Sequence, residues 1–64
     1  MTTQEAVQLW GGQTRLANAL GITRDAVHKW KQYPPIDKQF QIMVLSGGRL
    51  SVTYINEKGQ NNND

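Results

Sequence analysis

The apolar positions between residues 13 and 31 form two short runs, separated by Gly21. The first run consists of Leu16, Ala17 and Leu20, and the second repeats its spacing with Ile22, Ala26, Val27 and Trp30. Spacings of one, three and four residues place each run on one face of a helix. The pattern therefore predicts two amphipathic helices, over residues 13–20 and over residues 24 to about 32.

A very short turn joins these two helices. Helices connected in this way cannot lie antiparallel, so they must cross at a steep angle. Gly21 follows the first helix at a position where the backbone needs a positive φ angle. The small side chain of Ala17 allows the second helix to approach closely, and Thr23 is a favourable N-cap for it. This combination is typical of a helix-turn-helix.

Another helix is expected before this pair, over residues 2–10. Thr2 and Glu5 have the spacing of a capping box, in which each side chain satisfies a backbone amide of the other residue. The apolar stripe of this helix consists of Ala6, Val7, Leu9 and Trp10. Because Trp10 lies on this stripe, we expect it to be a core residue rather than a platform on which bases stack.

The stretch after Tyr33-Pro34-Pro35 allows two structures, because the prolines end the preceding helix but do not determine the next element. As a helix, it has an apolar face made of Ile36, Phe40, Met43 and Val44. As a β-hairpin over residues 38–55, it turns at Gly47-Gly48, and the β-branched residues after that turn favour a strand. Periodicity leaves both open. For Phe40 we favour a place in the monomer's core over a role in a dimer.

The length of 64 residues allows one small domain with a marginal core. We expect that domain over residues 1–55 and a disordered tail over residues 56–64, which are polar and have nothing to bury. Without cysteine there is neither a disulfide nor a thiolate metal site. No apolar run is long enough to cross a membrane, and the start lacks the pattern of a secretory signal. We therefore expect a cytoplasmic protein.

Charge is distributed unevenly along the chain. The formal net charge is only +2, yet residues 13–31 alone carry four basic residues and one acidic residue, Asp25. A surface that faces phosphates requires such a local excess. An ordinary solvated helix face fits the same charges equally well, so charge alone does not decide.

Five residues near the start of the helix over residues 24–32 are left facing outward: Thr23, Arg24, Asp25, His28 and Lys29. Such residues enter the major groove when a helix of this kind binds DNA. Arg24 can bridge O6 and N7 of a guanine, and Lys29 can reach a guanine edge or a phosphate. Thr23 can contact a phosphate or a thymine methyl group.

The other two outward residues have competing roles. Asp25 can accept a hydrogen bond from cytosine N4. A structural role, at the helix N-terminus or paired with Lys29, fits slightly better. His28, the only histidine, has no partner in the sequence for a catalytic or metal role, so we expect it to contact the groove or the backbone.

The first turn of the helix over residues 13–20 can bind a phosphate. Its backbone amides have no partner within the helix, and the side chain of Gln13 can add a hydrogen bond. The complete candidate set for DNA binding is Gln13, Thr14, Arg15, Thr23, Arg24, Asp25, His28, Lys29 and Lys31.

The chain offers little for catalysis. It has no cysteine, a single histidine, no glycine-rich phosphate loop and no acidic cluster that could hold a metal. We therefore expect neither an enzyme nor a cofactor, and no small-molecule substrate.

Residues 13–31 resemble the repressor-type helix-turn-helix: the motif's small fifth residue falls on Ala17, its turn glycine on Gly21, and two later apolar positions on Val27 and Trp30. The run GGQTRLANALGI and the short length resemble the Cro proteins of lambdoid bacteriophages. The run WKQYPPIDKQFQIMVLSGGRL is similar to their all-helical members. The resemblance spans about residues 4–50. It implies an all-α bundle of four to five helices, favours a fourth helix over the hairpin, and makes Gln13 a phosphate contact.

The resemblance further implies a transcriptional repressor that binds double-stranded operator DNA. One recognition helix reads few base pairs, so we expect a homodimer on two half-sites about 34 Å apart. The dimer could form in free solution or only on a near-palindromic operator. Arg24 and Asp25 replace residues that are often neutral in the relatives. We therefore expect this protein to recognise an operator sequence of its own, different from theirs. The candidate interface residues, most of which can equally complete the monomer's core, are Met43, Leu45, Leu50, Val52 and Tyr54.

A protein-interaction module is the alternative function. An antitoxin that also regulates its own promoter could use residues 50–56 as an unpaired apolar strand against a toxin. A toxin that co-purifies with the protein would favour this alternative.

Overall fold

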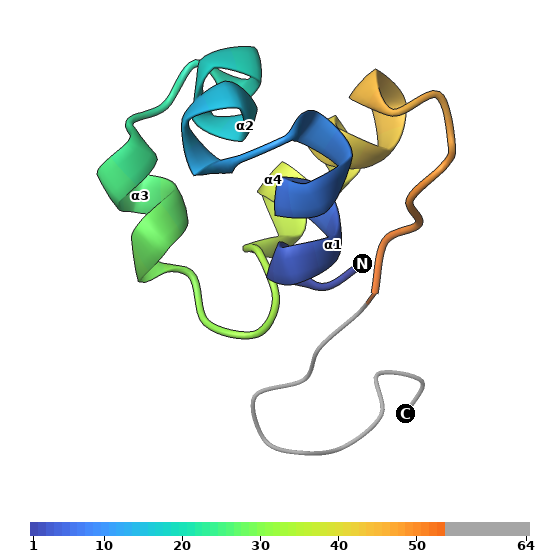
Figure 1. Cartoon of the computed structure of the whole chain (residues 1–64). Coiled ribbons are helices and arrows are strands. Elements are labelled where there is room, and N and C mark those ends of the chain that lie inside the picture. Colours follow the sequence, from blue (N-terminus) through green and yellow to red (C-terminus); the bar gives the residue numbers. More distant parts are fainter. Residues whose placement is uncertain (54–64) are drawn as a thin grey trace.

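The computed structural model describes residues 1–53, and four helices make up its ordered elements (Figure 1). They are α1 (Thr3–Trp10), α2 (Gln13–Leu20), α3 (Arg24–Lys29) and α4 (Ile36–Leu45). Within the described residues there is no strand, so the all-α prediction is confirmed and the hairpin is not formed. The predicted tail over residues 56–64 lies outside the described residues.

The capping box predicted at the start of α1 is present. The Thr2 hydroxyl accepts a hydrogen bond from the backbone N–H of Glu5 at 3.1 Å, and the Glu5 carboxylate accepts one from the N–H of Thr2 at 2.7 Å. Gly11 ends the helix with φ at 86°, which only glycine adopts without strain. Local sequence signals therefore account for both ends of α1.

Every helix contributes to one small core. The buried apolar residues are Met1, Ala6, Leu16, Ala17, Leu20, Val27 and Ile42. Both tryptophans are partly buried and pack against this cluster, as expected for Trp10 and for the stripe that includes Trp30. α2 supplies three of the seven residues, which places this helix at the centre of the domain.

The helix over residues 36–45 is confirmed, but of the four residues predicted for its apolar face, Met43 packs against the core and the other three are exposed. Ile42 and Gln39 are buried, whereas Ile36, Phe40 and Val44 are 43%, 42% and 72% exposed. The expectation that Phe40 lies in the core is therefore wrong. Gln39 can be buried because its amide donates to the carbonyl of Pro34 at 3.0 Å and its side-chain oxygen accepts from the backbone.

Residues 46–53 fold back across the domain to the start of the chain (Figure 1). The Ser46 hydroxyl accepts from the N–H of Leu50 at 3.2 Å, and Leu50 packs against the core. The amino group of Met1 donates to the carbonyl of Ser51 and to the Thr53 hydroxyl, at 2.5 and 2.7 Å. The C-terminal part of the described chain thus closes the core beside α1.

Candidate nucleic-acid interface

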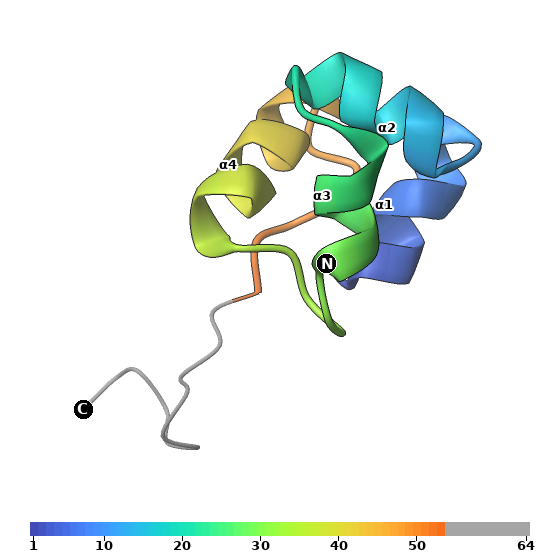
Figure 2. The ribbon, with the colours of Figure 1, turned by 90° about the vertical axis from the view of Figure 1, so that its left-hand side faces the viewer.

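α2 and α3 pack against each other through a tight turn at Gly21. This glycine has φ at 72°, and the N–H of Ile22 donates to the carbonyl of Ala17 at 3.0 Å across the turn. Ala17 is 1% exposed, so it leaves no room for a larger side chain between the helices. α3 runs across the direction of α2 (Figure 2), as predicted for a helix-turn-helix.

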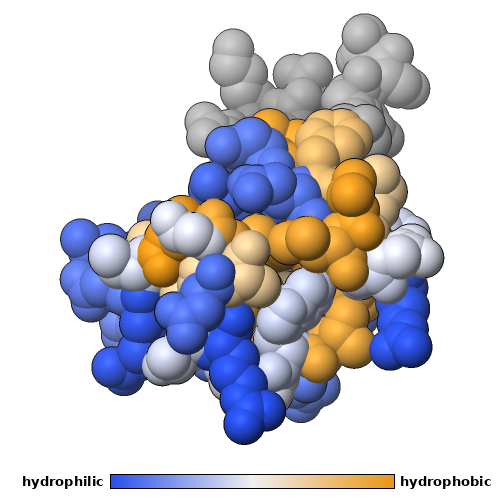
Figure 3. All heavy atoms as spheres, turned by 90° about the horizontal axis from the view of Figure 1, so that it is seen from above, coloured by the Kyte–Doolittle hydropathy of each residue, from blue (hydrophilic) through white to orange (hydrophobic). Residues whose placement is uncertain are grey.

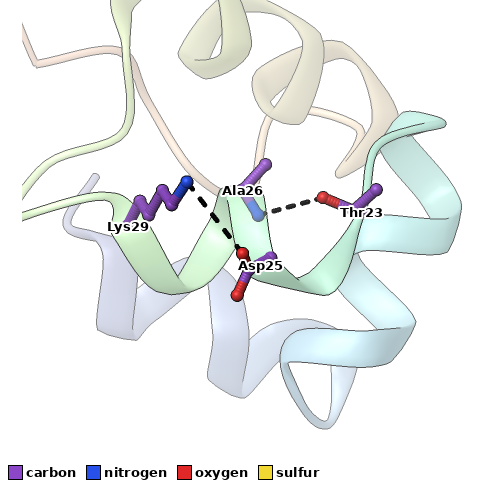
Figure 4. Close-up of polar contacts among 4 residues, drawn as sticks. All are labelled: Thr23, Asp25, Ala26 and Lys29. Atoms are coloured by element: carbon purple, nitrogen blue, oxygen red, sulfur yellow. Dashed lines mark hydrogen bonds and ion pairs between the residues drawn. The ribbon is translucent and has the colours of Figure 1, made fainter.

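Thr23 caps the start of α3. Its hydroxyl accepts a hydrogen bond from the backbone N–H of Ala26 at 3.1 Å (Figure 4). The hydroxyl oxygen is therefore engaged in capping, while its hydrogen remains able to donate. Thr23 has two uses: it fixes where α3 begins, and it stays exposed at the edge of the helix.

The inner and outer faces of α3 are sharply divided. Val27 is 1% exposed, and Ala26 is partly buried. The five residues predicted to face outward are all exposed: Thr23, Arg24, Asp25, His28 and Lys29. The helix itself forms one side of the molecule (Figure 2), with no other described element in front of it. Within the described residues, this face is therefore exposed to solvent.

Asp25 and Lys29 form the ion pair that their spacing predicts. The Lys29 ammonium lies 4.0 Å from the Asp25 carboxylate (Figure 4), and the side chains are 76% and 78% exposed. A pair this exposed contributes at most about 1 kcal/mol to stability, because water and salt screen it. Neither residue is fixed by the other, so both can turn to a ligand at little cost.

α3 is shorter than predicted. It ends at Lys29, because Trp30 adopts an extended conformation with ψ at 144°, so the predicted end near residue 32 is wrong. The next two residues are attached to α1 instead: Thr3 donates from its hydroxyl to the carbonyl of Lys31 at 2.9 Å and from its N–H to that of Gln32 at 2.8 Å. This long-range contact is invisible in the local pattern. Lys31 consequently lies in a loop beside the recognition face rather than on α3.

The start of α2 supplies a second set of polar groups. Gly12 precedes the helix, and no side chain caps it, so the first backbone amides are left for another partner. Gln13 is partly buried at this end, whereas Thr14 and Arg15 are exposed. A Cβ atom added at Gly11 would lie 3.4 Å from the Arg15 guanidinium, so Arg15 folds back over the turn between α1 and α2.

The described residues predicted for a dimer interface differ in how far they are exposed. Met43 and Leu50 pack against the protein's own core, and Val52 is partly buried. Leu45 is 51% exposed, and Tyr54 lies outside the described residues. The unpaired apolar strand that the antitoxin alternative needs is not seen in residues 50–53.

Most of the large exposed apolar side chains in the described residues lie on α4, and their exposure was not predicted from the sequence. Ile36, Phe40 and Val44 recur every four residues and form a stripe along α4. Leu9 and Leu45 line a separate hollow between the ends of α1 and α4. Figure 3, which views the molecule from that end, shows apolar side chains gathered in the middle of the face with polar ones around them. A sequence pattern that offers two apolar faces on α4 does not reveal which one is inside.

Among residues 1–53, no group of three or more histidine or acidic side chains could hold a metal ion. In the same part of the chain, no helix is long and apolar enough to cross a membrane.

Comparison with known proteins identifies the family. Residues 2–62 match the profile of the P22 Cro family, described as DNA-binding transcriptional regulator Cro. No curated protein and no solved structure matches the chain. The match covers nearly the whole sequence, including the helix pair and the exposed face of α3. Members of this family are DNA-binding regulators and not enzymes. The chain belongs to the P22 Cro family of DNA-binding transcriptional regulators.

Proposed function

We propose that the protein is a repressor that binds a specific double-stranded operator by placing α3 in the major groove. The observation that supports this most is the division of α3: its inner face is fixed by Val27 in the core, and its outer face presents five exposed polar side chains. Because Val27 anchors α3 in the core, the helix can present its outer side chains to base edges at a fixed depth in the groove.

Arg24 is the principal base contact in this proposal. It is the first residue of α3, and its guanidinium can donate two hydrogen bonds to O6 and N7 of a guanine. Lys29, one turn later, can reach a guanine edge or a phosphate. Asp25 and His28 lie between them on the same exposed face, where Asp25 can accept from a cytosine amino group.

The start of α2 fixes the protein on the sugar–phosphate backbone. A phosphate oxygen can accept from the uncapped backbone amides and from the side chain of Gln13. Thr14, Arg15 and Lys31 are exposed around this point and can approach neighbouring phosphates. Each such contact releases counterions, so affinity is expected to fall steeply as salt rises.

The protein acts as a homodimer in this proposal. Six residues of recognition helix read only a few base pairs, and two copies on half-sites one helical turn apart double that number. The exposed stripe on α4 offers the second copy an apolar surface, which Met43 and Leu50 do not. The dimer need not be stable off DNA, because the operator itself brings the two copies together. Occupying an operator that overlaps a promoter is then enough to repress it, in the cytoplasm of the host cell.

A binding-site selection from random duplexes tests this function. The expected result is one enriched sequence, nearly palindromic, with half-site centres about 10 base pairs apart. Enrichment of a single half-site without symmetry would contradict the proposed dimer and still support binding to DNA. Retention of all sequences alike at 0.2 M salt would remove sequence-specific recognition.

A further inference from the structure

A hollow lies beside the recognition face, where α1, α2 and the loop after α3 meet, and Val7 forms part of its apolar lining. It has a volume of about 470 Å³, and its polar lining includes Thr3, Gln4, Gln13, Lys31 and Gln32. We propose that this hollow binds one phosphodiester group of the operator's backbone, with Gln4 and Gln32 as contacts in addition to Gln13 and Lys31. This inference rests on the proposed DNA-binding function and assigns a DNA contact to α1.

The hollow is built by contacts that hold its walls together. Thr3 donates to the carbonyls of Lys31 and Gln32 at 2.9 and 2.8 Å, so the loop is attached to the first turn of α1. With both carbonyls engaged, the side chains of Lys31 and Gln32 remain exposed at the rim. Gln4 is also exposed, on the residue next to this attachment. The chain leaves the helix at Trp30, whose ψ is 144°, directly before the two residues whose carbonyls bind Thr3.

The chemistry of the lining suits an anion. Three side-chain amides and one ammonium group supply hydrogen-bond donors, and no carboxylate is among the lining groups. The acidic residue nearest in sequence, Glu5, has its carboxylate engaged by the N–H of Thr2 at 2.7 Å. Amide and ammonium groups can donate hydrogen bonds to phosphate oxygens. Contacts to phosphate and sugar make up at least half of the hydrogen bonds in protein–DNA complexes.

The position of the hollow indicates which part of the DNA it meets. Gln13 belongs both to this lining and to the start of α2, where a phosphate is already expected. Lys31 lies two residues beyond the end of α3, and Arg24 is at the opposite end of that helix. The contact would therefore fall on the backbone that borders the groove and carry no sequence information of its own.

Two matched pairs of variants test the hollow. Gln4→Glu adds one negative charge to the lining, and Gln41→Glu makes the same change on α4, where Gln41 is exposed and accepts from Lys38. Lys31→Gln and Lys38→Gln remove one positive charge inside and outside the hollow. We expect Gln4→Glu to weaken operator binding about tenfold, as for a lost hydrogen bond to a charged group. Lys31→Gln should lower the slope of log affinity against log salt by about 0.9. The two α4 variants should change neither quantity.

Neutral methylphosphonate groups, placed at one phosphate at a time, separate a local contact from a general charge effect. In a duplex with the substitution at the phosphate bound in the hollow, Gln4→Glu should no longer weaken binding. The hollow is not a phosphate site if Gln4→Glu weakens binding by the same factor whichever phosphate is replaced. The same conclusion follows if Gln4→Glu and Gln41→Glu change the affinity alike. If the unsubstituted protein binds all DNA sequences alike, the proposed function is contradicted, and so is this inference. Unchanged thermal unfolding of all four variants checks that they fold.

Discussion

The side-chain oxygen of Gln39 accepts a hydrogen bond from the backbone N–H of Thr53 at 2.7 Å. The amide of the same side chain donates to the carbonyl of Pro34 at 3.0 Å, and Gln39 is only 1% exposed. One buried polar residue thus joins α4 to the proline loop before it and to the segment that returns to α1. This arrangement explains why α4 turns a glutamine inward and leaves Phe40 at the surface.

Replacing Gln39 should therefore destabilise the fold. Gln39→Ala leaves the N–H of Thr53 and the carbonyl of Pro34 without their partner and opens a cavity, so we expect the free energy of unfolding to fall by about 2–3 kcal/mol. In a domain of this size that is a large fraction of the total. Urea unfolding followed by circular dichroism measures it. The exposed Gln41→Ala serves as the control and should change stability by less than about 0.5 kcal/mol. Equal effects of the two substitutions would show that the buried hydrogen bonds contribute little.

The ion pair between Asp25 and Lys29 should matter little for stability. Both side chains are more than 70% exposed, so we expect Asp25→Asn to change the free energy of unfolding by less than about 0.5 kcal/mol. Urea unfolding at low and high salt measures the change, with Lys29→Gln as the matched partner. A loss above about 1.5 kcal/mol would mean that the carboxylate stabilises the start of α3 far more than an exposed pair can. That result would assign Asp25 a structural role in place of a contact with DNA.

Gln13 should contribute equally to all DNA. A phosphate contact does not depend on sequence, so Gln13→Ala should weaken binding to the operator and to random duplexes by the same factor. Fluorescence anisotropy at one fixed salt concentration compares the two, and Gln8→Ala on the exposed side of α1 is the control. A loss confined to the operator would assign Gln13 to a base edge instead.

The α4 stripe should control cooperativity rather than contact with DNA. Val44 is 72% exposed, so Val44→Glu should leave the fold intact and place a charge in the proposed dimer surface. We expect unchanged affinity for a single half-site and weaker, non-cooperative binding to the full operator. Gln41→Glu is the control on the same helix. Cooperative binding that survives Val44→Glu would place the dimer contact elsewhere.

Local signals predicted the parts of the fold whose causes are local. The capping box of Thr2 and Glu5, the positive φ angle of Gly21 and the cap at Thr23 each involve residues at most a few positions apart. The boundaries of α2 follow from such signals directly. Gly21 and Thr23 fix where α3 begins, and its apolar spacing leaves the other residues facing outward, so most of the candidate site could be predicted from the sequence.

Long-range hydrogen bonds decided the parts that the sequence did not reveal. The bond between Gln39 and Thr53 spans 14 positions, and that between Thr3 and Lys31 spans 28. The first joins the inner face of α4 to the returning chain, and the second holds the loop after α3 against α1. Neither partner could be identified without the fold, so the exposed stripe on α4 and the hollow beside α1 were not predicted.

The most direct test of sequence recognition by α3 is the affinity of Arg24→Ala for the selected operator and for a random duplex, measured at the same salt concentration. If Arg24 bridges a guanine, the substitution should cost about 1–3 kcal/mol on the operator and little on random DNA. Because Arg24 is exposed and lies in the first turn of α3, its loss should not disturb the core. Equal losses on both duplexes would place Arg24 on the backbone and contradict base recognition by this residue.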